Sequence, residues 1–217
     1  MIKCIIFDYG NVIAKSRSAK FRDALFKKHG INPAKVKEYW KHFNHPYELG
    51  EMTNVQFLNG LRKYVNQEVS IQELANLFFM SDEPEEEMIH VIRKLSGYFE
   101  ITILSNSNPL LTQKIKHDGY FKHIRVKVFS DEIHIRKPDA RAYQITLRDL
   151  RYHPDQCIFV DDREENIRMA VKLGIRSILY DGHPHILFDE IMKIHALEEK
   201  EDLIFKRLSH EHRFLGL

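Results

Sequence analysis

Short runs of apolar residues recur along this chain, and after the second run each is separated from the next by a stretch long enough for a helix. Such runs are typical of strands buried in a parallel sheet, and their alternation with amphipathic stretches is typical of α/β folds. The predicted strands are Cys4–Phe7, Ile101–Leu104, Val126–Phe129, Cys157–Val160 and Ser177–Tyr180. The sequence therefore predicts an α/β protein built on a doubly wound parallel sheet.

The interval between the first two predicted strands breaks this alternation. It runs from about residue 13 to residue 100, far more than the single helix that a crossover connection needs. Its pattern predicts helices at Ala19–His29, Ala34–Phe43, Asn54–Val65, Ile71–Met80 and Pro84–Leu95. We expect the last helix to pack on the sheet and the others to form an all-helical cap at residues 15–84. Residues 1–14 and 85–217 then form the core.

Composition limits the class of protein. Apolar residues make up 43% of the 217 positions and charged residues 29%, as in ordinary soluble proteins. A net charge of +2 is too small to favour nucleic acid as a partner, and no apolar run is long enough to span a membrane. Asp8 interrupts the N-terminal apolar stretch too early for a signal peptide, so a cytoplasmic protein is expected, with Cys4 and Cys157 as reduced structural thiols. The sequence carries no signal for an oligomeric state.

Polar side chains follow several of the predicted strands at the point where each strand ends. In parallel sheets the carboxyl ends of the strands meet at one edge, which is where ligands bind in open α/β folds. This edge collects Asp8, Ser105, Asn106, Lys137, Asp161 and Asp162, with Asn166 one helical turn further on. The sequence therefore predicts a single site made of three carboxylates, a hydroxyl, two amides and a lysine.

This set of groups suits phosphoryl transfer. A carboxylate can attack phosphorus, and Mg²⁺ prefers carboxylate and phosphate oxygens as ligands. A lysine and a hydroxyl can hold the remaining phosphate oxygens. Each group also has a purely structural explanation: Asp8 can form a turn, Ser105-Asn106 and Asp161-Asp162 can cap helices, and Lys137 can be a solvated loop residue. These explanations account poorly for all four groups at successive strand ends.

The sequence resembles the haloacid dehalogenase (HAD) superfamily at this set of positions. The order of the motifs along the chain is that of the superfamily, and the long helical insertion resembles its helical cap. The motifs are Phe7-Asp8-Tyr9-Gly10-Asn11-Val12, Leu104-Ser105-Asn106, Lys137-Pro138-Asp139 and Val160-Asp161-Asp162 with Asn166. The resemblance implies a Rossmann-like core. It is strongest to the subgroup that contains the phosphatase domain of soluble epoxide hydrolase and bacterial sugar-1-phosphate phosphatases.

The resemblance also implies a role for each residue. Asp8 would be the nucleophile and a metal ligand, and Asp162 and the carbonyl of Gly10 would bind Mg²⁺. Ser105 and Asn106 would hold the phosphoryl group, and Lys137 would stabilise Asp8 and the transferring phosphate. Asp161 and Asn166 would orient ligands or metal-bound water. The expected substrate is a small phosphorylated metabolite.

Gly10 departs from the superfamily pattern, because most of its phosphatases carry a second aspartate at this position that serves as general acid and base. Such help is worth about 10²–10⁴-fold in rate. Without it, we expect esters with easily departing alcohols to be favoured, such as anomeric sugar phosphates or aryl phosphates. Two alternatives remain: a 2-haloacid dehalogenase, which needs no metal, and a non-catalytic phosphate-sensing or protein-binding module. Keeping both Asp161 and Asp162 favours the metal-dependent phosphatase.

Overall fold

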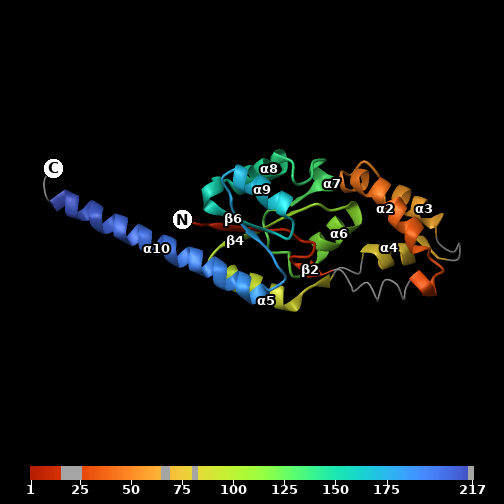
Figure 1. The fold of residues 1–217 in the computed structure, drawn as a ribbon, viewed down its shortest axis with the longest axis horizontal. Helices are drawn as coiled ribbons and strands as arrows, with labels where there is room; N and C mark the ends of the chain where they lie inside the picture. Colours follow the sequence, from red (N-terminus) through yellow and green to blue (C-terminus); the bar gives the residue numbers. More distant parts are fainter. Residues whose placement is uncertain (16–25, 65–68, 80–82, 215–217) are drawn as a thin grey trace.

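A computed structural model of the chain describes residues 1–15, 26–64, 69–79 and 83–214, with backbone alone for 77–79 and 202–214. Its centre is a parallel five-stranded sheet in the order β5-β4-β1-β6-β7 (Figure 1). The strands are β1 (Cys4–Phe7), β4 (Glu100–Ser105), β5 (Lys127–Phe129), β6 (Cys157–Asp161) and β7 (Arg176–Leu179). The predicted parallel α/β architecture is therefore confirmed, with strand boundaries within one residue of those expected.

Helices cover both faces of this sheet. One face is covered by α5, α6 and α10, which pack on alternate β1 residues such as Ile5 and Phe7. The other is covered by α8 and α9, which pack on Cys4 and Ile6. The bounds of these helices are Glu86–Leu95 (α5), Pro109–His117 (α6), Ala140–Leu150 (α8), Glu164–Lys172 (α9) and Pro184–Phe214 (α10). The alternation of β1 side chains between two separate clusters makes the sheet doubly wound. Both Cys4 and Cys157 are buried free thiols.

The long connection after β1 contains a group of helices at the far end of the molecule from the C-terminus (Figure 1). The described members are α2 (Pro33–Glu48), α3 (Asn54–Arg62) and α4 (Ile71–Phe79). They share a hydrophobic cluster of their own, in which Tyr47 stacks on Phe57 with ring centroids 4.1 Å apart. Tyr39 and Tyr47 of α2 therefore lie in the interior of a helical cap, whereas Phe43 is exposed. The helix predicted at Ala19–His29 lies mostly outside the described residues.

Helix α2 is longer than expected. The prediction ended it at Phe43, whereas it continues to Glu48 through Pro46. Pro46 removes one backbone donor, but the fully buried Tyr47 ring in the next position fixes the last turn against α3. Packing therefore outweighs the local signal for a helix end.

Among the described residues the cap contacts the core at several places, including one between α4 and α6. At another, the short strands β2 (Ala14–Lys15) and β3 (Glu83–Pro84) pair in antiparallel fashion, and Lys15 Nζ lies 2.6 Å from Glu85 Oε1.

A further attachment joins the end of α2 to α7 (Ser130–Ile133). Ser130 Oγ donates to the carbonyl oxygen of Glu48 at 2.6 Å, and His134 Nδ1 lies 2.7 Å from the carbonyl oxygen of Leu49. Gly50 has φ +68°, and a side chain there would overlap the carbonyl oxygen of Asp131. Only glycine therefore allows this close approach.

The C-terminal segment is helical, as predicted, and α10 extends well beyond the sheet (Figure 1). Its first part is anchored by Leu187 and Ile191, which are buried in the same cluster as α5. In the described part of the chain, no helix is both long enough and apolar enough to cross a membrane.

Candidate active site

Strand register brings the predicted residues together at the carboxyl edge of the sheet. Phe7 in β1 pairs with Ile103 in β4 and with Val160 in β6. The residues after these three therefore lie at one level, which places Asp8 between the ends of β4 and β6. Carboxylate oxygens of Asp8, Asp161 and Asp162 all lie within 4.8 Å of one another.

Lys137 reaches this cluster from the loop between α7 and α8. Its Nζ donates to Asp8 Oδ1 at 2.7 Å and to Asp161 Oδ2 at 2.6 Å. The lysine side chain is only 1% exposed, so its charge is removed from water and held by the two carboxylates. The loop carries a cis peptide bond between Lys137 and Pro138. The contacts of Lys137 with Asp8 and Asp161 place it between the ends of β1 and β6.

Asn106 fixes the backbone of that loop. Its Nδ2 donates to the carbonyl oxygen of Lys137 at 2.9 Å, and its Oδ1 accepts from the Lys137 N–H at 2.7 Å. One Nδ2 hydrogen remains for another acceptor. Ser105, which precedes it, is 2% exposed, and its hydroxyl makes a long contact of 3.4 Å with the Asn106 carbonyl. Asn106 thus holds the backbone of Lys137 in position, and its remaining Nδ2 hydrogen is available for a second role.

Asp161 is fully buried and saturated with donors. Besides Lys137, it accepts from Asn166 Nδ2 at 2.9 and 3.0 Å and from the backbone N–H of Arg163 at 2.9 Å. Asn166 Oδ1 is buried and has no hydrogen-bond partner among the described residues. A buried amide oxygen of this kind is a ready acceptor for a bound water.

The turn after β1 brings one further residue into the site. Asn11 has φ 56°, a left-handed conformation that asparagine tolerates well, and its Nδ2 donates to Asp162 Oδ2 at 3.0 Å. The sequence showed the Gly-Asn turn but gave no role to the Asn11 side chain. Gly10 does not need glycine for its backbone conformation, and a Cβ at this position would meet no atom within 4 Å.

The electrostatics of the site follow from burial and crowding. Burial and, to a smaller extent, the neighbouring Asp161 raise the pKa of Asp8 to about 6, against the lowering effect of Lys137. For Lys137, burial alone lowers the pKa, but the carboxylates of Asp8 and Asp161 outweigh it and leave the pKa raised. The lysine is therefore cationic at neutral pH, and Asp8 is an unusually basic carboxylate.

The donor set fits a divalent cation. Asp8 and Asp161 contact Lys137, and Asp162 lies within 4.8 Å of both carboxylates, so three acidic groups share one lysine charge among the described residues. Asp162 is half-buried, and among the described residues only the Asn11 amide donates to its carboxylate, so it retains free oxygen lone pairs. Hard oxygen ligands at this spacing are those that Mg²⁺ prefers.

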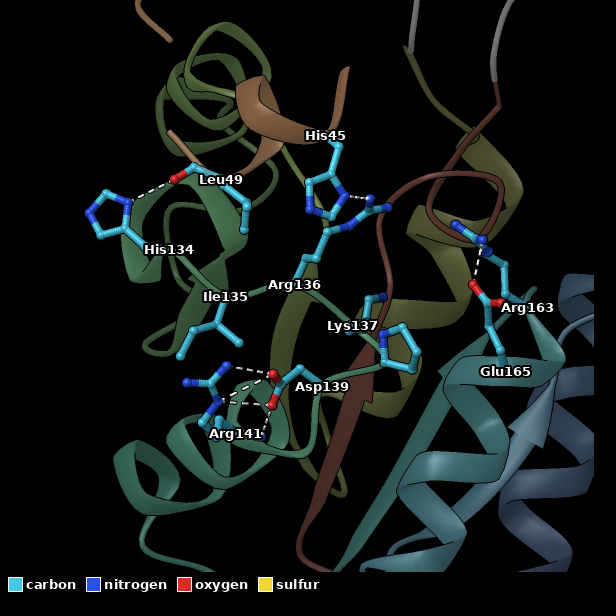
Figure 2. A pocket seen from close by; sticks show the side chains of 11 residues that line it. His45, Leu49, His134, Ile135, Arg136, Lys137, Asp139, Arg141, Arg163 and Glu165 are labelled. Atoms are coloured by element: carbon cyan, nitrogen blue, oxygen red, sulfur yellow. Dashed lines mark hydrogen bonds and ion pairs between the residues drawn. The ribbon is translucent and has the colours of Figure 1, made fainter. Parts of the chain in front are cut away.

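A cavity of about 450 Å³ is lined by Lys137, whose Nζ contacts Asp8 and Asp161 (Figure 2). Its walls come from the end of α2, from residues 134–141 and from the start of α9. Among the side chains that line it, His45 and Arg136 are in contact although they are 91 positions apart. No local sequence signal marks such a pair, and neither residue was predicted to belong to the site.

Comparison with known proteins adds two curated relatives. The chain is 23% identical over 188 residues to a D-ribitol-5-phosphate phosphatase of Bacteroides thetaiotaomicron, covering 82% of this chain and 91% of that protein. It is 25% identical over 192 residues to the drimenol cyclase DrtB of Aspergillus calidoustus, covering 83% of this chain but only 34% of that protein.

Solved structures share the fold. A HAD family enzyme of Bacteroides thetaiotaomicron, in complex with magnesium and inorganic phosphate, superposes with a TM-score of 0.72 at 19% identity, covering 84% of this chain and 96% of that one. The L-2-haloacid dehalogenase of Xanthobacter autotrophicus superposes with a TM-score of 0.61 at 16% identity, covering 82% and 76%. A sequence model of the haloacid dehalogenase-like hydrolase family matches residues 2–174. The chain therefore belongs to the haloacid dehalogenase-like hydrolase family and is a hydrolase.

Proposed function

We propose that this hydrolase is a Mg²⁺-dependent phosphatase that acts on small phosphorylated metabolites through an aspartyl-phosphate on Asp8. The observation that carries the proposal is the buried bridge from Lys137 to Asp8 and Asp161, with Asp162 alongside. An ammonium group beside a basic carboxylate suits attack on a phosphate monoester, whose charge it offsets. The relative named D-ribitol-5-phosphate phosphatase supports a small phosphorylated substrate.

Asp8 is the nucleophile in this proposal. Its Oδ1 is held by Lys137, which leaves Oδ2 to attack phosphorus. The new O–P bond forms as the ester P–O bond breaks, and the alcohol leaves with a proton taken from solvent. Water then attacks the phosphorus, which releases inorganic phosphate and regenerates the carboxylate. The Ser105 hydroxyl and the remaining Nδ2 hydrogen of Asn106 bind phosphoryl oxygens.

Asp8, Asp162 and the carbonyl of Gly10 would hold Mg²⁺, which supplies charge neutralisation between the nucleophile and the anionic substrate. Asp161 keeps Lys137 and Asn166 in place through four hydrogen bonds to its side chain. Asn166 Oδ1 orients a water in this arrangement. Asn11 donates its Nδ2 hydrogen to Asp162 Oδ2 and so holds that carboxylate in place.

Substrate access is the task of the cap in this proposal. We assign residues 15–84 to the cap and residues 1–14 and 85–217 to the core. The antiparallel pairing of Ala14–Lys15 with Glu83–Pro84 supports these boundaries, because both crossings between the two parts lie there. The separate hydrophobic cluster of α2, α3 and α4 supports them as well.

A panel of phosphate esters, assayed with and without Mg²⁺, tests the function. We expect metal-dependent phosphate release from wild type and none from Asp8→Asn. Release of halide from 2-haloacids without metal would favour a dehalogenase instead. Ligand binding with no turnover of any ester would favour a phosphate-sensing module. Ser96→Ala, which alters an exposed hydroxyl that contacts the Arg93 carbonyl, serves as the control.

A further inference from the structure

The cavity beside the carboxylate cluster has the position that the non-phosphate part of a substrate would need. It is lined by Lys137, which contacts Asp8, and by Arg163, whose backbone N–H donates to Asp161. Its other wall is formed by His45 and Leu49 at the end of α2 (Figure 2). A group esterified to a phosphate at Asp8 can therefore extend into it, and its volume of about 450 Å³ suits a small metabolite.

The charges of the cavity wall are already paired. Each of the three arginines that line it has a carboxylate partner, and the pairs are Arg136–Glu48, Arg141–Asp139 and Arg163–Glu165. A second anionic group on the substrate would have to compete with these carboxylates. Hydroxyl groups both donate and accept, so they can bind such a wall without separating any ion pair.

The hydrogen-bond partner of each histidine in the wall fixes which ring nitrogen carries the proton. Arg136 Nη1 lies 2.7 Å from His45 Nδ1, and a guanidinium can only donate, so Nδ1 accepts and the proton of neutral His45 is on Nε2. At His134 the partner of Nδ1 is the carbonyl oxygen of Leu49, so Nδ1 donates there and Nε2 carries a lone pair. The wall thus offers one imidazole donor and one imidazole acceptor.

We propose that this cavity selects polyhydroxylated phosphate monoesters, and that His45 determines the selection by donating its Nε2–H to a substrate hydroxyl. Arg136 is a positioning residue, because its contact with Nδ1 fixes both the tautomer and the orientation of the ring. The inference rests on the proposed phosphatase function and adds the class of the esterified group.

Two variants of His45 separate direct recognition from a structural role. His45→Asn keeps an acceptor near the position of Nδ1 for Arg136 but lacks the Nε2 donor. His45→Gln keeps a donor near the position of Nε2. With an anomeric sugar phosphate, we expect kcat/KM to fall about three- to tenfold in His45→Asn, the loss of one neutral hydrogen bond, and to be largely kept in His45→Gln. Para-nitrophenyl phosphate has an alcohol that departs as easily but carries no hydroxyl group, so with this substrate the two variants should have equal kcat/KM.

Three results would overturn the proposal. The first is equal loss for both substrates in His45→Asn, and the second is rescue by asparagine but not by glutamine, which would mean that the ring acts only through Arg136. The third is a wild-type preference for esters that carry a second phosphate or carboxylate. Calorimetric binding of the sugar phosphate and of inorganic phosphate to Asp8→Asn, with and without His45→Asn, gives a readout free of turnover. If binding shows the preference but no ester is hydrolysed, the proposed function fails and the selection by His45 stands.

Discussion

Replacing Asp8 by asparagine should make the metal-free protein more stable at neutral pH. The pKa of Asp8 rises from its ordinary value of 3.8 to about 6 because burial disfavours the charged form more than Lys137 favours it. One pKa unit corresponds to about 1.4 kcal/mol, so the ionised carboxylate costs the fold about 3 kcal/mol. Asparagine resembles the protonated acid and removes this cost. Lys137 stays paired in the variant, because Asp161 remains 2.6 Å away.

The pH dependence gives the sign of the effect. Between pH 3.8 and about 6 the folded protein binds more protons at Asp8 than the unfolded chain does, so the free energy of unfolding of wild type falls as pH rises through this window. Asp8→Asn loses this dependence. Its advantage should therefore be near zero at about pH 4 and reach about 3 kcal/mol above about pH 6.5.

Urea unfolding in the presence of a chelator, followed by Trp40 fluorescence across this pH range, measures the difference. Mg²⁺ should then stabilise wild type more than the variant, because the variant lacks one ligand oxygen charge. Asp139→Asn is the matched control: Arg141 lowers the pKa of Asp139, so neutralising this exposed carboxylate should weaken the fold slightly at neutral pH. A destabilised Asp8→Asn, or a gain that does not change with pH, would refute the reasoning.

Three other changes have defined outcomes. Gly10→Asp should fold, because a Cβ at this position meets no atom within 4 Å. The new acid should raise kcat/KM for alkyl phosphates at least about tenfold, whereas Gly10→Asn should not. Equal values of kcat/KM in the two variants would show that no general acid is missing. At limiting Mg²⁺, phosphatase activity should rise with pH through about 6 as Asp8 loses its proton. Saturating Mg²⁺ should shift this rise in the pH–activity profile to lower pH, because the metal competes with the proton for the carboxylate. A rise whose midpoint does not change with Mg²⁺ would contradict the role of Asp8 as a ligand. Gly60→Ala should cost about 1–3 kcal/mol of unfolding free energy in thermal or urea melts, because its methyl overlaps the buried Tyr39 hydroxyl, whereas Gly119→Ala should be tolerated.

The sheet and its polar edge could be predicted because their signals are local. Each strand is a short apolar run, and the side chains of interest follow the ends of β1, β4 and β6, which are neighbours in the sheet. Contacts between distant segments had no such signal. Asn106 was predicted to hold phosphate, but both ends of its amide bind the backbone of Lys137, 31 positions away. The roles of the site residues, as distinct from their positions, remain predictions.

The end of α2 illustrates why the cavity could not be predicted. Pro46 indicates a helix end, yet the buried ring of Tyr47 carries the helix on to Glu48. That extra turn brings His45 to Arg136, and so creates one wall of the cavity. A wall built by tertiary contacts on both sides leaves no periodic pattern in the sequence.

The contact at the end of α2 ties one wall of the cavity to the core. The carbonyl oxygen of Leu49 lies 2.7 Å from His134 Nδ1, and both residues line the cavity. The loop that carries His134 also carries Lys137, whose Nζ contacts Asp8. One short segment thus holds both the cap and the charge beside the nucleophile, so a substitution that loosens the end of α2 should also disturb Lys137.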